Sequence, residues 1–318
     1  MMNPVHGYTR HSIRWLITAV VLLFLGHFAW SNWQRIRVLD FDVRLAILAL
    51  SMAVLAVHFL GRALLWHFLT TRYRIDISLT QSVGAWFLSQ LGKYIPGKVF
   101  MYFGRLFYYA RHGRSKTLFS ICFAVETMAT ILSSTLVVMI ALANVGIPEL
   151  QPYEPLLLLT LVGLVAALHP TVLRKLASLV LRALGRSPID FIPRGRDTAI
   201  FVALYSVNWL VFGWAFFLFI NSIYRIGTEH ILYLAGSFSA ASLIAMFGVF
   251  VPSGLGVREG VLIFMLAPVV SVEAAIVVSF ASRLWFTATE LTGVGASWIF
   301  MRGLLPPKTE LDTFAATS

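Results

Sequence analysis

Charged side chains inside long apolar segments are the residues of this sequence that could do chemistry. They are five cations and three carboxylates: Lys93, Lys98, Arg105, Arg258, Arg283, Glu126, Glu259 and Glu290. A charge at the centre of a bilayer costs at least about 2.5–3.5 kcal/mol on insertion scales, so such residues face a partner, water or a substrate. The surplus of cations favours an anion, and the simplest anion that belongs in a membrane is a lipid phosphate.

Each of these charges also has a structural explanation. Glu126 could form an ion pair with a facing Lys or Arg, and Arg258 with Glu259 could form a salt-bridged turn. Arg283 and Glu290 are seven residues apart, so on a helix they share one face, and that face must look into the bundle. For Arg283 the sequence favours a substrate role, since arginine can grip phosphate in a bidentate way.

The two lysines flank a turn-forming break in an apolar region. Lys93 and Lys98 could reach toward lipid head groups with their long side chains. Their position on either side of a Pro-Gly pair favours a cavity instead.

Composition explains the apolar background. Hydrophobic residues make up 58% of the 318, and charged residues only 12%, against about 25% in soluble domains. We therefore expect one all-α, polytopic membrane domain over residues 1–318. The net charge of +11 comes from basic residues between apolar segments, a pattern typical of topology signals and contacts with anionic lipid and not of nucleic-acid binding.

Six segments are apolar enough to be membrane-spanning helices, which need about 20 residues. They lie near 13–31, 45–69, 117–143, 155–169, 198–221 and 273–301. The fourth is short. The first has no small-residue cleavage pattern, so we expect a retained helix and not a signal peptide.

Two further apolar regions, 81–110 and 231–269, are interrupted by proline and glycine. The interrupting residues are Pro96, Gly97, Pro252, Gly254 and Gly256. Arms of about 13–15 residues make roughly 20 Å of helix, too short for about 30 Å of hydrocarbon, although the arm 231–250 could span. Backbone freed in this way is tolerated at membrane depth only inside protein or beside water. We therefore expect two re-entrant helical hairpins with tips near the bilayer middle.

Basic residues predict the orientation. Segment 170–197 carries six Lys or Arg residues and segment 144–154 carries none, so the first is predicted to be cytoplasmic and the second external. Both termini are then cytoplasmic. The loop at 32–44 is discordant, because it is predicted to be external but contains three arginines.

This arrangement predicts an inverted repeat. The halves 13–143 and 155–301 each contain two spans, a hairpin and a last span, in opposite orientations. Pro96 precedes Glu126 by 30 residues, and Pro252 precedes Arg283 by 31. Inverted repeats with broken helices that meet at the midplane are a transporter architecture.

No motif for a metal, ATP or covalent chemistry stands out, and we expect no cofactor. His27, His58 and His67 are scattered over the first two predicted helices without a partner four residues away, which argues against metal binding. The one cysteine, Cys122, lies in an apolar run. Without an ATP site, any transport would be passive or coupled to an ion gradient.

The two breaks, GKYIPGKV at 92–99 and PSGLGVREG at 252–260, resemble the paired signatures of the lysylphosphatidylglycerol synthase transmembrane-region family. The likeness covers roughly 13–301 and implies a flippase-like domain that translocates lipid in a bacterial inner membrane. Glu126 and Arg283 fall where the family places intramembrane charges, but Thr127 stands where the family often has arginine.

The same resemblance sets an expectation about catalysis. Full-length members carry a separate soluble domain that attaches lysine to phosphatidylglycerol. This chain stops at Ser318, so we expect a stand-alone member without aminoacyl transfer. The alternatives to a flippase are a membrane enzyme acting on a lipid head group, with Glu126 or Glu290 as acid or base, and an accessory subunit that hands lipid to a biosynthetic complex.

The inverted repeat predicts a labelling pattern. The variants Gly97→Cys and Ser253→Cys are each made in a Cys122→Ala background. Because the two hairpins are predicted to enter from opposite sides, the two cysteines should react with a membrane-impermeant thiol reagent from opposite sides of the membrane. Reaction of both positions from the same side would contradict the repeat.

Overall fold

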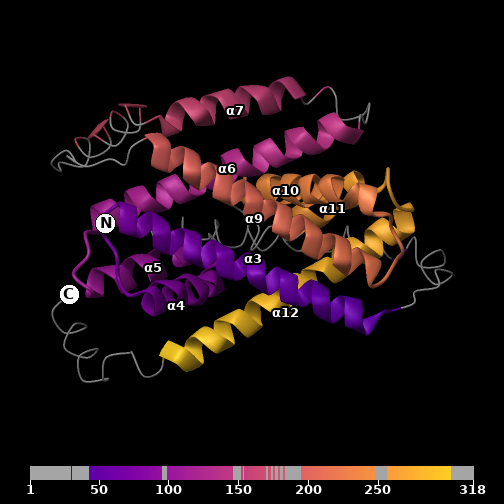
Figure 1. Ribbon diagram of the computed structural model, residues 1–318, viewed down its shortest axis with the longest axis horizontal. Coiled ribbons are helices and arrows are strands. Elements are labelled where there is room, and N and C mark those ends of the chain that lie inside the picture. Colours follow the sequence, from indigo (N-terminus) through magenta and orange to yellow (C-terminus); the bar gives the residue numbers. More distant parts are fainter. Residues whose placement is uncertain are drawn as a thin grey trace, which may run out of the picture.

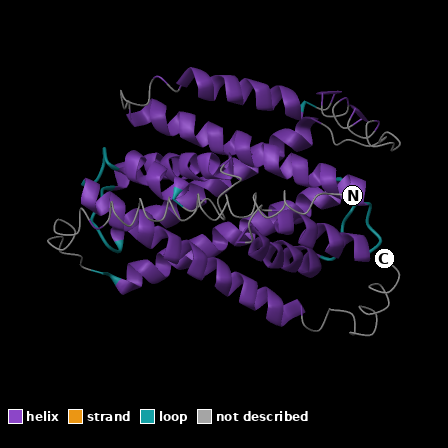
Figure 2. Cartoon of the chain, turned by 180° about the vertical axis from the view of Figure 1, so that it is seen from behind, coloured by secondary structure: helices purple, strands orange, loops and turns teal. Residues whose placement is uncertain are grey.

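The computed structural model describes residues 43–94, 99–145, 154–169, 195–247 and 256–301, with isolated residues elsewhere. Regular structure in these ranges is entirely helical, which confirms the predicted class (Figure 2). Four of the described helices are long and apolar enough to cross a membrane. They are α3 (Leu45–Arg72), α6 (Lys116–Val145), α9 (Gly195–Asn221) and α12 (Val272–Met301).

These four helices match four of the six predicted spans. The predicted span at 155–169 is α7 (Glu154–Leu168), an apolar helix of 15 residues that packs on α6 and is shorter than the other four. The predicted span at 13–31 lies outside the described residues apart from Trp30.

Helices α3 and α9 run side by side in opposite directions through the centre of the bundle (Figure 1). At one end, the Arg44 N–H donates to the Ser222 carbonyl at 2.9 Å. At the other end, Arg72 lies 3.9 Å from Asp197 in an ion pair. The end of α3 and the start of α9 therefore share one side of the bundle.

The two interrupted regions form pairs of shorter helices. The first contains α4 (Leu79–Gln90), the 3-10 turn η1 (Leu91–Tyr94) and α5 (Val99–Arg111). The second contains α10 (Ile231–Phe247) and α11 (Val257–Leu266). Each pair turns back on itself, and the pairs lie toward opposite ends of the long axis (Figure 1). This geometry matches the predicted hairpins, although their entry into a membrane stays a prediction.

Local sequence explains where these helices begin. Ser78 and Gln81 form a capping box at the start of α4, each side chain bonding the other's backbone N–H at 3.3 Å. Gly256, directly before α11, has φ of +83°, a left-handed conformation that glycine adopts without strain. The other predicted breaking residues, Pro96, Gly97, Pro252 and Gly254, lie outside the described residues.

Each hairpin packs on a long helix from the other half of the chain. Helix α4 contacts α3, α5 and α12, while α10 contacts α9, α11 and α6. The two sets of neighbours correspond one to one. Helix α3 beside α4 corresponds to α9 beside α10, α5 corresponds to α11, and α12 corresponds to α6. The hairpins are thereby held between long helices.

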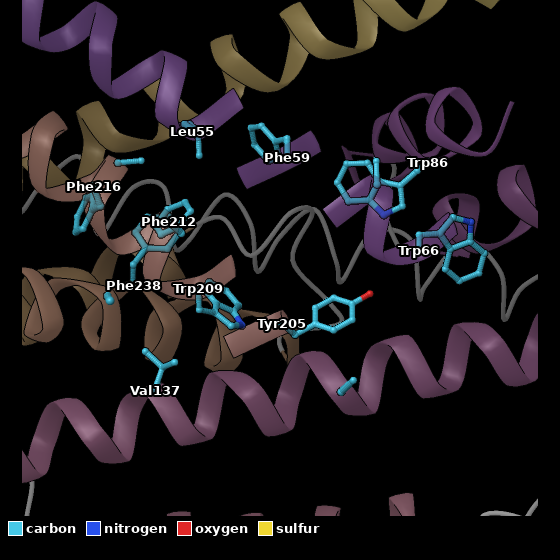
Figure 3. Packing of buried hydrophobic residues seen from close by; sticks show 14 of the residues in the cluster. Leu55, Phe59, Trp66, Trp86, Val137, Tyr205, Trp209, Phe212, Phe216 and Phe238 are labelled. Carbon is cyan, nitrogen blue, oxygen red and sulfur yellow. The ribbon is translucent and has the colours of Figure 1, made fainter. Parts of the chain in front are cut away.

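The core is aromatic and closely packed. Phe212 on α9 lies 4.2 Å from Phe238 on α10 between ring centroids, and Phe219 stacks on Trp285 of α12 at 4.7 Å. Figure 3 shows Phe212, Phe216 and Phe238 gathered at one end of this core. Small residues allow the close approach, because a Cβ on Gly213 would lie 2.2 Å from the Cβ of Ala235.

This close approach predicts a stability effect. Gly213→Ala should lower the free energy of unfolding by about 1–3 kcal/mol, because the added methyl group forces α9 and α10 apart. Thermal unfolding of the purified protein in detergent measures the change. The matched control is Gly163→Ala on α7, where a Cβ meets no atom within 4 Å. An equal Tm for Gly213→Ala and the parent would contradict the packing.

Candidate functional site

The described intramembrane charges form two groups, and the first is a sealed ion pair. Nη1 of Arg105 on α5 lies 2.8 Å from Oε2 of Glu126 on α6, and Trp86 Nε1 donates to the other carboxylate oxygen at 3.3 Å. Arg105 Nε donates to Ser89 Oγ at 3.2 Å. Arg105 is 1% exposed and Glu126 is 5% exposed, so neither charge faces open space.

Aromatic rings close this ion pair on its remaining sides. The Arg105 guanidinium lies 4.3 Å from the Trp66 ring centroid and 5.6 Å from that of Phe123. Such stacking suits arginine, whose planar group is weakly hydrated. The arrangement is the structural ion pair that the sequence left as the alternative for Glu126, and it ties α5 to α6.

The second group, here called the tip cluster, consists of Lys93, Tyr94, Arg258, Glu259, Arg283 and Glu290. On one side, the Lys93 ammonium pairs with the Glu290 carboxylate, and the Tyr94 hydroxyl donates to Glu290 Oε2 at 2.7 Å. Glu290 is 1% exposed. Helix α12 is therefore bonded to the turn that ends α4.

On the other side, Glu259 of α11 is the acceptor. Arg283 Nη1 donates to its Oε1 at 2.8 Å, and the Gly256 backbone N–H donates to Oε2 at 2.6 Å. Arg258 Nη2 lies 3.5 Å from the same carboxylate. Helix α12 is thus bonded to the start of α11 as well.

Helix α12 bridges the two hairpins through residues on one face. Arg283 and Glu290 are two turns apart, about 10.5 Å along a helix, and each bonds a different hairpin. The ring of Phe286, between them in sequence, lies 4.9 Å from Lys93 Nζ and 5.4 Å from the Arg258 guanidinium. The shared face predicted for Arg283 and Glu290 is where the structure brings the hairpins together.

The tip cluster has more cations than carboxylates. Lys93, Arg258 and Arg283 share two acceptors, Glu259 and Glu290. Two buried guanidinium nitrogens of Arg258, Nε and Nη2, have no hydrogen-bond partner among the described residues. Lys98, the remaining predicted cation of the first break, lies outside those residues. A buried donor without an acceptor is costly, so the cluster can accept an anion.

A cavity of about 190 Å³ adjoins the tip cluster. It is bounded by α3, α4, η1, α6, α9, α10 and α12, and Lys93 and Glu290 are the members of the predicted set that line it. Figure 3 shows Phe59 and Trp86 on one side, opposite Trp209, Phe212 and Phe238. Its polar lining also includes residues that the sequence analysis did not select as ligands: His58, Arg62, Gln90 and Ser242.

Arg62 could have been found from the sequence. It lies near the middle of α3, a predicted span, and is a charge in an apolar run like the eight residues selected above.

Comparison with known families now gives the chain its context. The model of the family described as "Lysylphosphatidylglycerol synthase TM region" matches residues 12–288. The chain belongs to this family. A search of curated proteins found no match. In this lysylphosphatidylglycerol synthase transmembrane-region member, the matched region contains both hairpins and every described charge of the site except Glu290, which lies two residues beyond it.

The sealed ion pair predicts an asymmetric mutational response. Glu126→Gln should lower the free energy of unfolding by about 3–5 kcal/mol, because it leaves the Arg105 charge buried without a partner. The double variant Arg105→Met/Glu126→Leu should recover most of this loss, since it removes both charges at similar volume. Thermal unfolding in detergent measures both.

The control for this pair is Glu229→Gln, a carboxylate whose side chain is 71% exposed. Its Tm should match that of the parent. A double variant no more stable than Glu126→Gln would show that the pair does more than neutralise charge.

Proposed function

We propose that the chain translocates an anionic lipid, phosphate-bearing or polyprenyl-linked, across the bacterial inner membrane. The observation that carries the proposal is the tip cluster, where three described cations meet two carboxylates between two opposed hairpins. The sequence of the same break contains one further cation, Lys98, which lies outside the described residues. An anionic head group would be the missing acceptor, while its chains stay in the lipid.

Family membership supports a lipid substrate. The family is described as the transmembrane region of a synthase that makes a lipid, so a membrane role in lipid biosynthesis or movement follows from the match. A site between two hairpins at the centre of a helical bundle is also where secondary transporters hold their substrates.

The packing pattern supports alternating access by two opposed halves. Each hairpin packs on a long helix of the other half, so one half can rock against the other about the α3–α9 contact. The ion pairs of α12 could couple substrate binding to movement of the hairpins. A phosphate that competes with Glu259 for Arg283, and with Glu290 for Lys93, would loosen the bonds that hold α12 to the hairpins.

Translocation is tested with purified protein in liposomes that contain fluorescent lipids of known head group. We expect transfer of labelled anionic lipid between leaflets, and a loss of at least tenfold in rate for Arg283→Gln, because the main Glu259 partner and a phosphate donor are both removed. Arg283→Lys should keep part of the rate, since it retains the charge without the fork. The control is Arg72→Gln, an exposed arginine on α3.

No movement of labelled anionic lipid by the parent, over a broad panel of head groups, would sink the transport proposal. Formation of a lipid product by the purified protein, lost in Glu126→Gln, would favour the membrane enzyme instead. Cellular function that survives Arg283→Gln but is lost on surface substitutions would favour the accessory subunit.

A further inference from the structure

We propose that the cavity beside the tip cluster is a phosphate site, with Arg62 as its principal ligand, for a phosphate monoester or a small phosphodiester. The inference deepens the proposed transport function and rests on it only for the lipid nature of the ligand. The evidence is the isolation of Arg62, the polar groups around it and the size of the space.

Arg62 differs from the other described intramembrane cations in having no carboxylate partner among the described residues. Lys93, Arg105, Arg258 and Arg283 each contact Glu126, Glu259 or Glu290. Arg62 is partly buried near the middle of α3, and its recorded contact in the described structure is the Tyr205 ring, 4.8 Å from the guanidinium. A guanidinium at this depth without an anion is the group that a phosphate would satisfy.

The surrounding groups suit a phosphate ester with a polar substituent. Nδ1 of His58 faces the Asn208 carbonyl oxygen at 3.0 Å and therefore carries the hydrogen, which leaves Nε2 as an acceptor for a ligand hydroxyl. Gln90 and Ser242 add an amide and a hydroxyl to the lining. Lys93 lines the same space, so a phosphate on Arg62 lies next to the tip cluster.

The volume admits a head group. About 190 Å³ is far more than the roughly 10–15 Å³ that one water needs by the same measure. This is enough for a phosphate and further heavy atoms. Aromatic side chains make up much of the wall, including Phe59, Trp86 and Phe286.

As a phosphate ligand, Arg62 contributes to binding and not to the stability of the unliganded protein. An unpaired buried charge weakens the unliganded protein, so its removal should leave folding unharmed or improved. If Arg62 instead has a structural role and holds α3 against Tyr205, its removal should lower the stability of the protein.

The experiment measures binding to the purified protein in detergent by the rise in Tm that a ligand produces. The probes are dihexanoyl phosphatidic acid, dihexanoyl phosphatidylcholine, dihexanoyl glycerol and inorganic phosphate. We expect phosphatidic acid to bind best, phosphatidylcholine more weakly because of its bulky cationic choline, and dihexanoyl glycerol not at all. Inorganic phosphate that binds as tightly as phosphatidic acid would assign the site to the free ion and not to a lipid.

Arg62→Gln should weaken phosphatidic acid binding at least tenfold while its own Tm without ligand equals or exceeds that of the parent. Arg72→Gln, an exposed arginine on the same helix, should bind normally. Unchanged binding in Arg62→Gln, a lowered Tm or failure to fold, or equal binding of dihexanoyl glycerol by the parent would each overturn the assignment. Binding that depends on Arg62 in a protein that moves no lipid would instead overturn transport and leave the site standing.

Discussion

A charge in a bilayer must face an opposite charge, water or a ligand, and this constraint organises the centre of the molecule. Helix α12 satisfies it in both directions, with a cation at Arg283 for Glu259 and a carboxylate at Glu290 for Lys93. Because these two residues are two turns apart, a single helix holds both hairpins at once. These ion pairs, together with packing of α4 on α12 and of α10 on α6, hold both hairpins in place.

The same residue types serve two different purposes a short distance apart. Arg105 and Glu126 are matched one to one, both carboxylate oxygens have donors, and aromatic rings cover the guanidinium. Among the described residues the tip cluster is unmatched, with one more cation than carboxylates and with two Arg258 nitrogens that have no hydrogen-bond partner. Trp86 connects the two, since it donates to Glu126 and also lines the cavity. A rigid ion pair behind the cavity wall keeps that wall in place, while the unmatched charges stay available to a ligand.

Hydropathy and helical period account for what the sequence predicted well. Long apolar runs fixed four spans to within a few residues, and the spacing of seven put Arg283 and Glu290 on one face. The sequence could not predict which charges form ion pairs. Arg105 and Glu126 lie on different helices, and no periodicity relates their positions. The cavity depends on α3, α4, α9 and α10 meeting in space, so no pattern in the sequence brought His58 and Gln90 together. Arg62 was overlooked among apolar neighbours although its charge was visible.

The charge at the centre suits a phosphate better than it suits a self-contained bundle. Around the cavity and tip cluster, Arg62, Lys93, Arg258 and Arg283 face two carboxylates, which leaves two positive charges among the described residues. A phosphate monoester carries about −1.5 to −2 at neutral pH, and a diester carries about −1. In a centre with equal numbers of cations and carboxylates, every charge would have an ion-pair partner within the protein, and an anionic ligand would gain little by binding. An excess of this size disfavours the unliganded state, and an anion bound there would favour the conformation that binds it more tightly.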